Sequence, residues 1–243
     1  MEEDLILLNS APYFLYGAFS LITLAENQSG VDLMKKTFKK SFKKPNIISI
    51  RALTVTAIMS ALSFALMMIE FSVPFMPPFI KFDVSELPAL ITSFAFGPEY
   101  GVLVCLLKNV LHLPLSQTQY VGELSNFLMG AVFVFFAGLF YKIKKTRNFA
   151  FLGAMVGNFA MAVACFLVNF FITYPIYMKI LIPEPVILGM YQQILPSMDS
   201  IWKSILVFNV PFTFAKGLVS VIITFLIYRK LSPILKGKLE YKS

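Results

Sequence analysis

The sequence predicts an all-α integral membrane protein with six transmembrane helices. Of its 243 residues, 58% are hydrophobic and only 14% are charged, whereas soluble globular chains carry about 25% charged residues. Its long, nearly uncharged stretches suffice for helices that cross a hydrocarbon core of roughly 30 Å, at ~1.5 Å per residue. The basic residues gather between these stretches, which indicates an ordered topology.

The basic clusters predict which side of the membrane each loop occupies. Sixteen of the 21 Lys and Arg residues fall within Lys35 to Arg51, Lys142 to Arg147 and Arg229 to Lys242. Cytoplasmic loops are enriched in Lys and Arg. We therefore expect these three loops, and the C-terminus, to be cytoplasmic. This clustering explains the net charge of +8 better than nucleic-acid binding does.

The first predicted span runs from Ile47 to Ile69, with Arg51 as its one charged residue. Residues 70–86 contain three prolines among polar residues, and such a segment cannot form a regular helix that faces lipid. It is predicted to be an outer loop. Spans two and three follow as residues 87–96 and 100–113, separated by a Gly-Pro turn signal. Both are short and the second is interrupted by polar residues, which favours helices that line a cavity.

The remaining three spans end at the basic clusters. Span four is expected from Val121 to Tyr141 and span five from Phe149 to Tyr177. Gly153 and Gly157 form a GxxxG pattern that permits close helix contact. A proline-containing polar outer loop should then lead to span six, residues 204–228.

The chain is predicted to divide into a membrane domain, residues 51–236, and smaller flanking segments. Residues 34–50 should be a basic cytoplasmic segment, and residues 237–243 a cytoplasmic tail. Residues 1–33 form an N-terminal extension in which Leu5 to Ala25 is uncharged and long enough to span. Either this stretch is a seventh helix, or translation begins at Met34.

Catalytic and metal-binding motifs are absent from the sequence. It contains no GxxxxGK[ST] phosphate loop and only one histidine, His112, so ATP hydrolysis, a His-based metal cluster and a Ser-His-Asp triad are not expected. We predict that the chain is not an enzyme and needs no cofactor. Asp83, Glu86 and Glu123 leave open a membrane enzyme that uses carboxylates, solvated loop charges, or the mouth of a ligand site.

Several motifs resemble those of a transporter family. They are Lys81 to Leu90, Phe96-Gly97-Pro98, Leu107-Lys108-Asn109 and Gly122 to Phe127. In this order and spacing they resemble the substrate-binding S component of an energy-coupling factor (ECF) transporter, most closely its riboflavin-specific members. The resemblance extends from about Arg51 to Lys236.

This resemblance implies a six-helix bundle that binds a vitamin near the extracellular side and works with a membrane coupling protein and two ATPases. Riboflavin would be a transported ligand. Ala57, Ala61 and Ala65 recur every four residues, which makes one face of the first helix small. The resemblance assigns this face to the coupling protein, whereas ordinary packing within the chain is the alternative.

The resemblance also gives candidate ligand contacts. An asparagine both donates and accepts, so Asn169 is suited to the dione edge of a flavin, and Lys216 inside a span needs a partner or a wet cavity. Lys108 either lines the cavity or extends to an interface, with Glu123 as its expected counter-charge. The aromatic outer loop, including Phe82, is expected to act as a lid. The other candidates are Asp83, Asn109, Asn126, Asn209 and Thr213.

One residue departs from the family pattern. Related sequences commonly have Asn where this chain has Thr213. A hydroxyl reaches less far than an amide and has a single donor, so water or Asn209 would have to replace a contact. An S component for another vitamin is therefore an alternative, and a membrane protein that only assembles with others is a second.

Overall fold

The computed structural model describes residues 50–235, with side chains described as far as residue 227. The predictions for residues 1–33, 34–49 and 237–243 lie outside this part of the chain. The described elements are α3 (Ile50–Met68), β1 (Phe71–Ser72), β2 (Lys81–Phe82), α4 (Glu86–Phe96), α5 (Pro98–His112), η1 (Leu113–Leu115), α6 (Val121–Ile143), α7 (Arg147–Val168), η2 (Asn169–Thr173), α8 (Tyr174–Ile180), α9 (Glu184–Gln192), α10 (Ile201–Ser204), η3 (Ile205–Asn209) and α11 (Val210–Leu235).

The all-α membrane class is confirmed. Among the described residues, four helical stretches are long and apolar enough to cross a bilayer: Ile50–Met68, Val121–Ile143, Arg147–Ile180 and Ile201–Ile227. The helices α4 and α5 are shorter, as predicted for spans two and three. The total of six spans stays a prediction.

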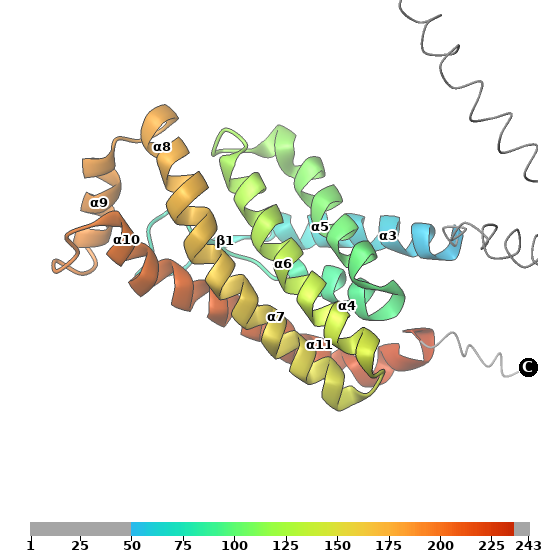
Figure 1. The fold of residues 1–243 in the computed structure, drawn as a ribbon. Coiled ribbons are helices and arrows are strands. Elements are labelled where there is room, and N and C mark those ends of the chain that lie inside the picture. The colour runs from blue at the N-terminus through green and yellow to red at the C-terminus, as the bar shows by residue number, and fades with distance from the viewer. Residues whose placement is uncertain (1–49, 236–243) are drawn as a thin grey trace, which may run out of the picture. The chain divides into compact units, whose positions relative to one another are not determined.

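Two glycines bring α6 and α7 together along their lengths, and these helices run side by side in Figure 1. A Cβ at Gly157 would overlap the carbonyl oxygen of Phe133, and one at Gly153 would lie 2.7 Å from that of Ala137. Neither position can therefore carry a larger side chain without a backbone shift. The prediction of a close GxxxG contact is confirmed, and its partner is α6.

Both of the longest helices contain one π-helical turn. The segment η2 interrupts the helix made of α7 and α8, and η3 interrupts the helix made of α10 and α11. Asn169 is the first residue of η2 and Asn209 is the last residue of η3. Such turns often occur at functional sites because the extra residue changes the direction of the side chains. Two candidate asparagines thus lie at irregular points of otherwise continuous helices.

The two predicted outer loops contain regular structure that the sequence analysis missed. Between α3 and α4, strands β1 and β2 pair antiparallel, with Phe71 opposite Phe82 and Ser72 opposite Lys81. Between α8 and α10, the segment expected to be a loop contains α9, whose first turn carries Pro185. Proline is tolerated there because the first amide groups of a helix have no partner within it. Figure 1 shows α8, α9 and α10 together at one end of the bundle.

Candidate ligand-binding site

Two adjoining cavities lie within the described part of the bundle. The first, of about 150 Å³, is lined by the β2 region, α4, α6, α7, η2, α8 and the η3–α11 helix. The second, of about 390 Å³, is lined by the end of α3, the 70–83 loop, the residues around η1, α6, and the α8–α9 region. Phe79, Lys81, Gly122, Asn126 and Tyr177 line both. The cavities are therefore two compartments of one candidate site.

Lys216 lies at the wall of the first cavity, where it is held by two carboxylates. Its Nζ is 2.8 Å from Oδ2 of Asp83 and 3.5 Å from Oε2 of Glu86. The Lys216 side chain is 11% exposed, and both carboxylates are 4% exposed or less. The expectation that Lys216 faces a partner or a cavity is therefore correct on both counts.

A second lysine completes a buried charge cluster, which comprises Asp83, Glu86, Lys108 and Lys216. Lys108 Nζ lies 3.1 Å from Oε1 of Glu86 and also donates to the Ser85 hydroxyl. Lys108 is fully buried and lines neither cavity, so the alternative in which it extends to an interface is wrong. Its expected pairing with Glu123 is also wrong, because the chain before α4 folds back and places Glu86 closer.

The charges of this cluster balance, which explains how it is buried. Burial by itself raises the pKa of the Asp83 carboxyl, but the nearby Lys216 and Lys108 charges outweigh it and hold that pKa below its ordinary value. Asp83 also accepts a hydrogen bond of 2.8 Å from the backbone amide of Ser85. Asp83 therefore stays ionised, and the two acids and two bases neutralise each other.

Asn169 on η2 and Thr213 on α11 both line the first cavity and share one hydrogen-bond acceptor. The Asn169 amide donates to Sγ of Cys165 over 3.2 Å, and the Thr213 hydroxyl donates to the same sulfur over 3.1 Å. A thiol sulfur is a weak acceptor. Both donors are thus directed at the cavity wall but are held there only loosely, so a ligand with carbonyl acceptors can compete for them.

Asn209 belongs to a closed ring of hydrogen bonds beside the first cavity. Its amide donates to the Tyr174 hydroxyl over 2.9 Å and accepts from the Tyr191 hydroxyl over 2.7 Å, while the two hydroxyls also bond to each other. This ring joins η3 to α8 and α9. Asn209 is therefore occupied, although it still lines the cavity.

The loop between α3 and α4 places an aromatic side chain in the same region. The Phe79 ring makes edge contacts with Tyr174, Tyr177 and Tyr191, with centroids 6.2–6.3 Å apart. Phe82 belongs to the same loop, and its ring lies 6.2 Å from that of Phe212, which lines the first cavity. Phe79, Ile80 and Lys81, rather than Phe82, are the residues of this loop that line the cavity.

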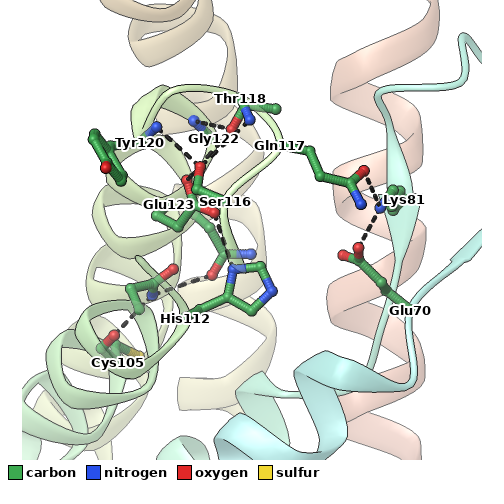
Figure 2. Close-up of polar contacts among 12 residues, drawn as sticks. Glu70, Lys81, Cys105, His112, Ser116, Gln117, Thr118, Tyr120, Gly122 and Glu123 are labelled. Carbon is green, nitrogen blue, oxygen red and sulfur yellow. Dashed lines mark hydrogen bonds and ion pairs between the residues drawn. The ribbon is translucent and has the colours of Figure 1, made fainter. Parts of the chain in front are cut away.

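The second cavity has its own polar cluster, drawn in Figure 2. One oxygen of Glu123 lies 2.9 Å from Nδ1 of His112, and the other accepts from Ser116 over 2.8 Å and from Thr118 over 3.3 Å. On the facing side of Figure 2, Lys81 lies between Glu70 and Gln117. Glu123 is therefore a buried, fully bonded wall residue and not a solvated loop charge.

The structure groups most of the predicted site residues. Asn126, Asn169, Asn209, Thr213 and Lys216 line the first cavity, and Asp83, Glu123 and Asn126 line the second. Asn109 lies behind the wall, where its amide donates to the Cys105 carbonyl over 2.8 Å and to Asn126 over 3.4 Å. Phe82, Lys108 and Asn109 line neither cavity. Contact of any of these residues with a ligand stays a prediction.

Sequence reasoning missed several residues of the first cavity. The hydroxyl-bearing members are Ser125, Thr173, Tyr174 and Tyr177, and the charged members are Lys81 and Glu86. Glu86 was interpreted as one of three loop-end carboxylates, although it immediately precedes an apolar run and is only 3% exposed. The signal in the sequence is a charged residue at the start of an apolar helix, which indicates a buried charge. Nothing in the sequence distinguishes the tyrosines from interfacial aromatics.

The alanines of α3 lie on its exposed side. Ala57, Ala61 and Ala65 are all exposed, whereas Thr56, Ser60 and Ser63 face the bundle. The Ser63 hydroxyl donates to the Ser85 carbonyl beside the charge cluster. Packing of the alanine face within the described part of the chain is thus the wrong alternative. No described part of the chain covers this face.

Comparison with known proteins gives the family of the chain. The family model of the ECF transporter, substrate-specific component, matches residues 51–228. The riboflavin transporter RibU of Staphylococcus aureus is 31% identical, over 80% of this chain and 97% of its own, and the riboflavin transporter FmnP of Bacillus subtilis is 29% identical, over 76% and 94%. A solved S component of a bacterial ECF transporter superposes with a TM-score of 0.61 and 32% identity, over 76% of this chain and 98% of the other. Members of this family are transporter components and not enzymes. The chain is a multi-pass membrane protein, and it belongs to the substrate-specific S components of ECF transporters.

Proposed function

We propose that this chain is the riboflavin-binding subunit of an ECF importer and that the first cavity is its ligand site. The observation that carries the proposal is the juxtaposition of Asn169, Thr213 and Lys216 with apolar residues in one cavity between α6, η2 and α11. A flavin has a flat, largely apolar ring, a polar dione edge and a hydroxylated chain, so it needs such a mixed wall. Relatives that match most of the chain carry the name riboflavin transporter.

We propose that the Asn169 side chain forms hydrogen bonds with the dione edge of the flavin. Its amide donates only to a thiol in the described structure, so exchange for a flavin carbonyl replaces a weak acceptor by a strong one. Met129, Met161 and Phe212 supply apolar surface for the ring. Methionine is suited to this role because its thioether is polarisable and its chain adapts to aromatic surfaces.

The exposed alanine face of α3 is the proposed contact with the membrane coupling protein, which would join the chain to two ATPases. Small residues allow two helices to approach closely inside a membrane, where packing replaces the hydrophobic effect as the driving force. We further propose that the basic Lys142 to Arg147 loop and the C-terminus lie in the cytoplasm, in accordance with the positive-inside rule. The vitamin site would then open to the outside.

The test is the absorption spectrum of the protein purified in detergent, followed by titration with riboflavin while intrinsic fluorescence is recorded. A yellow preparation, or saturable quenching at one ligand per chain with submicromolar affinity, supports the proposal. If the protein is colourless and does not bind riboflavin, riboflavin is not its ligand. Other vitamins would then be titrated, because Thr213 at the usual asparagine position favours that second candidate.

A further inference from the structure

Asn126 lies in the wall that the two cavities share. It belongs to α6, lines both cavities and is partly exposed. An amide side chain has an acceptor end, its oxygen, and a donor end, its NH₂ group. The end that turns toward the cavities therefore decides which ligand groups this part of the wall can bind.

The orientation of the Asn126 amide is set by Asn109, which lies on α5 behind the wall. The Asn109 NH₂ group donates to the Cys105 carbonyl over 2.8 Å, and the same nitrogen donates to Oδ1 of Asn126 over 3.4 Å. A backbone carbonyl can only accept, so the Asn109 nitrogen must lie at this end of its amide. Its second proton then needs an acceptor, and Asn126 supplies one only if its oxygen points toward Asn109.

The donor end of Asn126 is consequently left for the cavities. Among the described residues, the Asn126 side chain makes a single hydrogen bond, the one through its oxygen. Its NH₂ group lies at the other end of the amide and has two protons to donate. The shared wall thus presents a donor, which is matched by a carbonyl oxygen, a ring nitrogen or a hydroxyl oxygen of a ligand.

Asn109 has a bonding pattern that is not explained by stability. It is only 4% exposed, yet its Oδ1 has no hydrogen-bond partner in the part of the chain that the structure describes. A buried acceptor without a partner is costly, because it loses its hydration without compensation. The side chain therefore carries a stability cost, and the contact that it makes toward the site is its bond to Asn126.

We propose that Asn109 is a positioning residue of the ligand site and that it holds the Asn126 amide with its donor end toward the cavities. Asn109 itself lines neither cavity, so it acts on a ligand only through Asn126. By fixing this amide, Asn109 makes the shared wall specific for an acceptor. The inference rests on the proposed function, since riboflavin has carbonyl, ring-nitrogen and hydroxyl acceptors for such a donor.

The first variant is Asn109→Asp, which keeps the shape of the side chain but reverses its hydrogen bonding toward Asn126. An ionised carboxylate donates to neither partner, and a protonated one has a single proton, for which the Cys105 carbonyl is the nearer acceptor. In both states an oxygen faces Asn126, so the Asn126 amide should turn over and present its own oxygen to the cavities. Riboflavin affinity, measured by fluorescence titration in detergent, should fall about tenfold, as expected for one lost hydrogen bond.

A double-mutant cycle shows whether this effect passes through Asn126. Asn126→Ala removes the amide that Asn109 orients, and it should lower riboflavin affinity by about the same factor. In that background, Asn109→Asp should lower the affinity by no more than about twofold further. If Asn109→Asp costs another tenfold there, it acts through the packing of the bundle and the proposal is disproved.

The matched control is Asn158, a buried asparagine with the same bonding pattern and no link to the site. Its NH₂ group donates to the Phe214 carbonyl over 3.0 Å, its Oδ1 has no partner among the described residues, and it lines neither cavity. Asn158→Asp should lower the melting temperature as Asn109→Asp does, but it should leave riboflavin affinity unchanged. Equal losses of affinity in the two variants would overturn the proposal.

Asn126→Asp tests the donor end even if the Asn109 variant fails to fold. One carboxylate oxygen can still accept from Asn109, while the other replaces the NH₂ group that faces the cavities. Riboflavin affinity should fall about tenfold or more, and an unchanged affinity disproves the proposal. If the unaltered protein does not bind riboflavin, the proposed function fails and this inference fails with it. The two failures are distinguishable, because only the second is seen in the unaltered protein.

Discussion

Lys216 shows how a charged residue is accommodated inside an apolar helix. A lysine at the centre of a span costs roughly 2.5–3.5 kcal/mol on the insertion scale, and burial of two acids adds a desolvation cost. Here Asp83 lies 2.8 Å from Lys216, and the second lysine, Lys108, balances Glu86. The cluster joins the start of α4 to α5 and α11. The same atoms that make the site polar therefore also hold three helices in place.

Replacement of Lys216 by Met should lower both stability and riboflavin affinity. The change leaves Asp83 without its closest counter-charge, and loss of one partner from a buried ion pair costs about 3–5 kcal/mol. The melting temperature in detergent and the riboflavin affinity are both measured. The double variant Asp83→Asn with Lys216→Met removes the orphaned charge, so it should recover most of the stability and none of the affinity. If affinity returns with stability, Lys216 has only a structural role.

Replacement of Asn169 by Ala should affect binding but not stability. In the described structure the Asn169 amide donates to a thiol, and loss of such a weak bond costs little. Loss of the proposed bond to the dione edge should weaken riboflavin binding about tenfold, which corresponds to roughly 1.4 kcal/mol.

The matched control is Asn158 on the same helix. Its amide donates to the backbone carbonyl of Phe214 over 3.0 Å, and it does not line either cavity. Asn158→Ala should lower the melting temperature and leave riboflavin affinity unchanged. If the two variants behave alike, Asn169 is an ordinary interhelical residue.

At the scale of elements, the bundle depends on close approach between α6 and α7. A Cβ at Gly157 would overlap the Phe133 carbonyl oxygen and lie 3.1 Å from the Ala137 amide nitrogen. These are backbone atoms, so they cannot move aside without a shift of a whole helix. The glycine therefore sets the distance between the two helices, both of which carry walls of the first cavity.

Gly157→Ala should destabilise the bundle by about 1–3 kcal/mol, the usual cost of overpacking. A lower melting temperature and a weaker riboflavin affinity are expected together, because separation of α6 from α7 moves η2 relative to the Ser125 and Asn126 side of the cavity. Gly189→Ala is the control, since a Cβ at Gly189 would meet no atom within 4 Å. Equal melting temperatures for the two variants would contradict this account.

The elements were predictable where composition alone decides them. Span four was expected from Val121 to Tyr141 and is the helix Val121–Ile143, because hydropathy and the basic cluster mark its end. The helix α9 was not foreseen, since its prolines were interpreted as loop signals although Pro185 lies in the first turn. The hairpin of β1 and β2 is too short to have a periodic pattern.

The site was predictable residue by residue but not in its pairings. Asn169 and Thr213 were predicted from the family resemblance, and Lys216 from its charge inside an apolar span. All three line one cavity. The partner of Lys108 was misassigned to Glu123, because the sequence does not contain the path of the chain that brings Glu86 to it. Pairings depend on tertiary geometry, which no local pattern records.

At the scale of the whole molecule, polar and small residues are placed on opposite sides of α3. Thr56, Ser60 and Ser63 are buried against the bundle, whereas Ala57, Ala61 and Ala65 are exposed. A lipid-facing helix surface has no need of small residues, since large aliphatic side chains are equally compatible with lipid. If the proposed partner contact is made by this alanine face, it lies on the opposite side of α3 from the buried polar residues.

Ala61→Phe should abolish riboflavin uptake without a change in riboflavin binding. The bulky ring prevents close approach of a partner helix at the centre of the alanine face, but it points away from both cavities. Binding is measured on the purified chain, and uptake is measured in vesicles that contain the chain with its coupling protein and ATPases. Leu62→Phe is the matched control, because Leu62 is the exposed neighbour that already carries a large side chain; it should retain both activities. If the Ala61→Phe variant takes up riboflavin normally, the partner contact must lie on another face. If the variant no longer binds riboflavin, the alanine face is not independent of the ligand site.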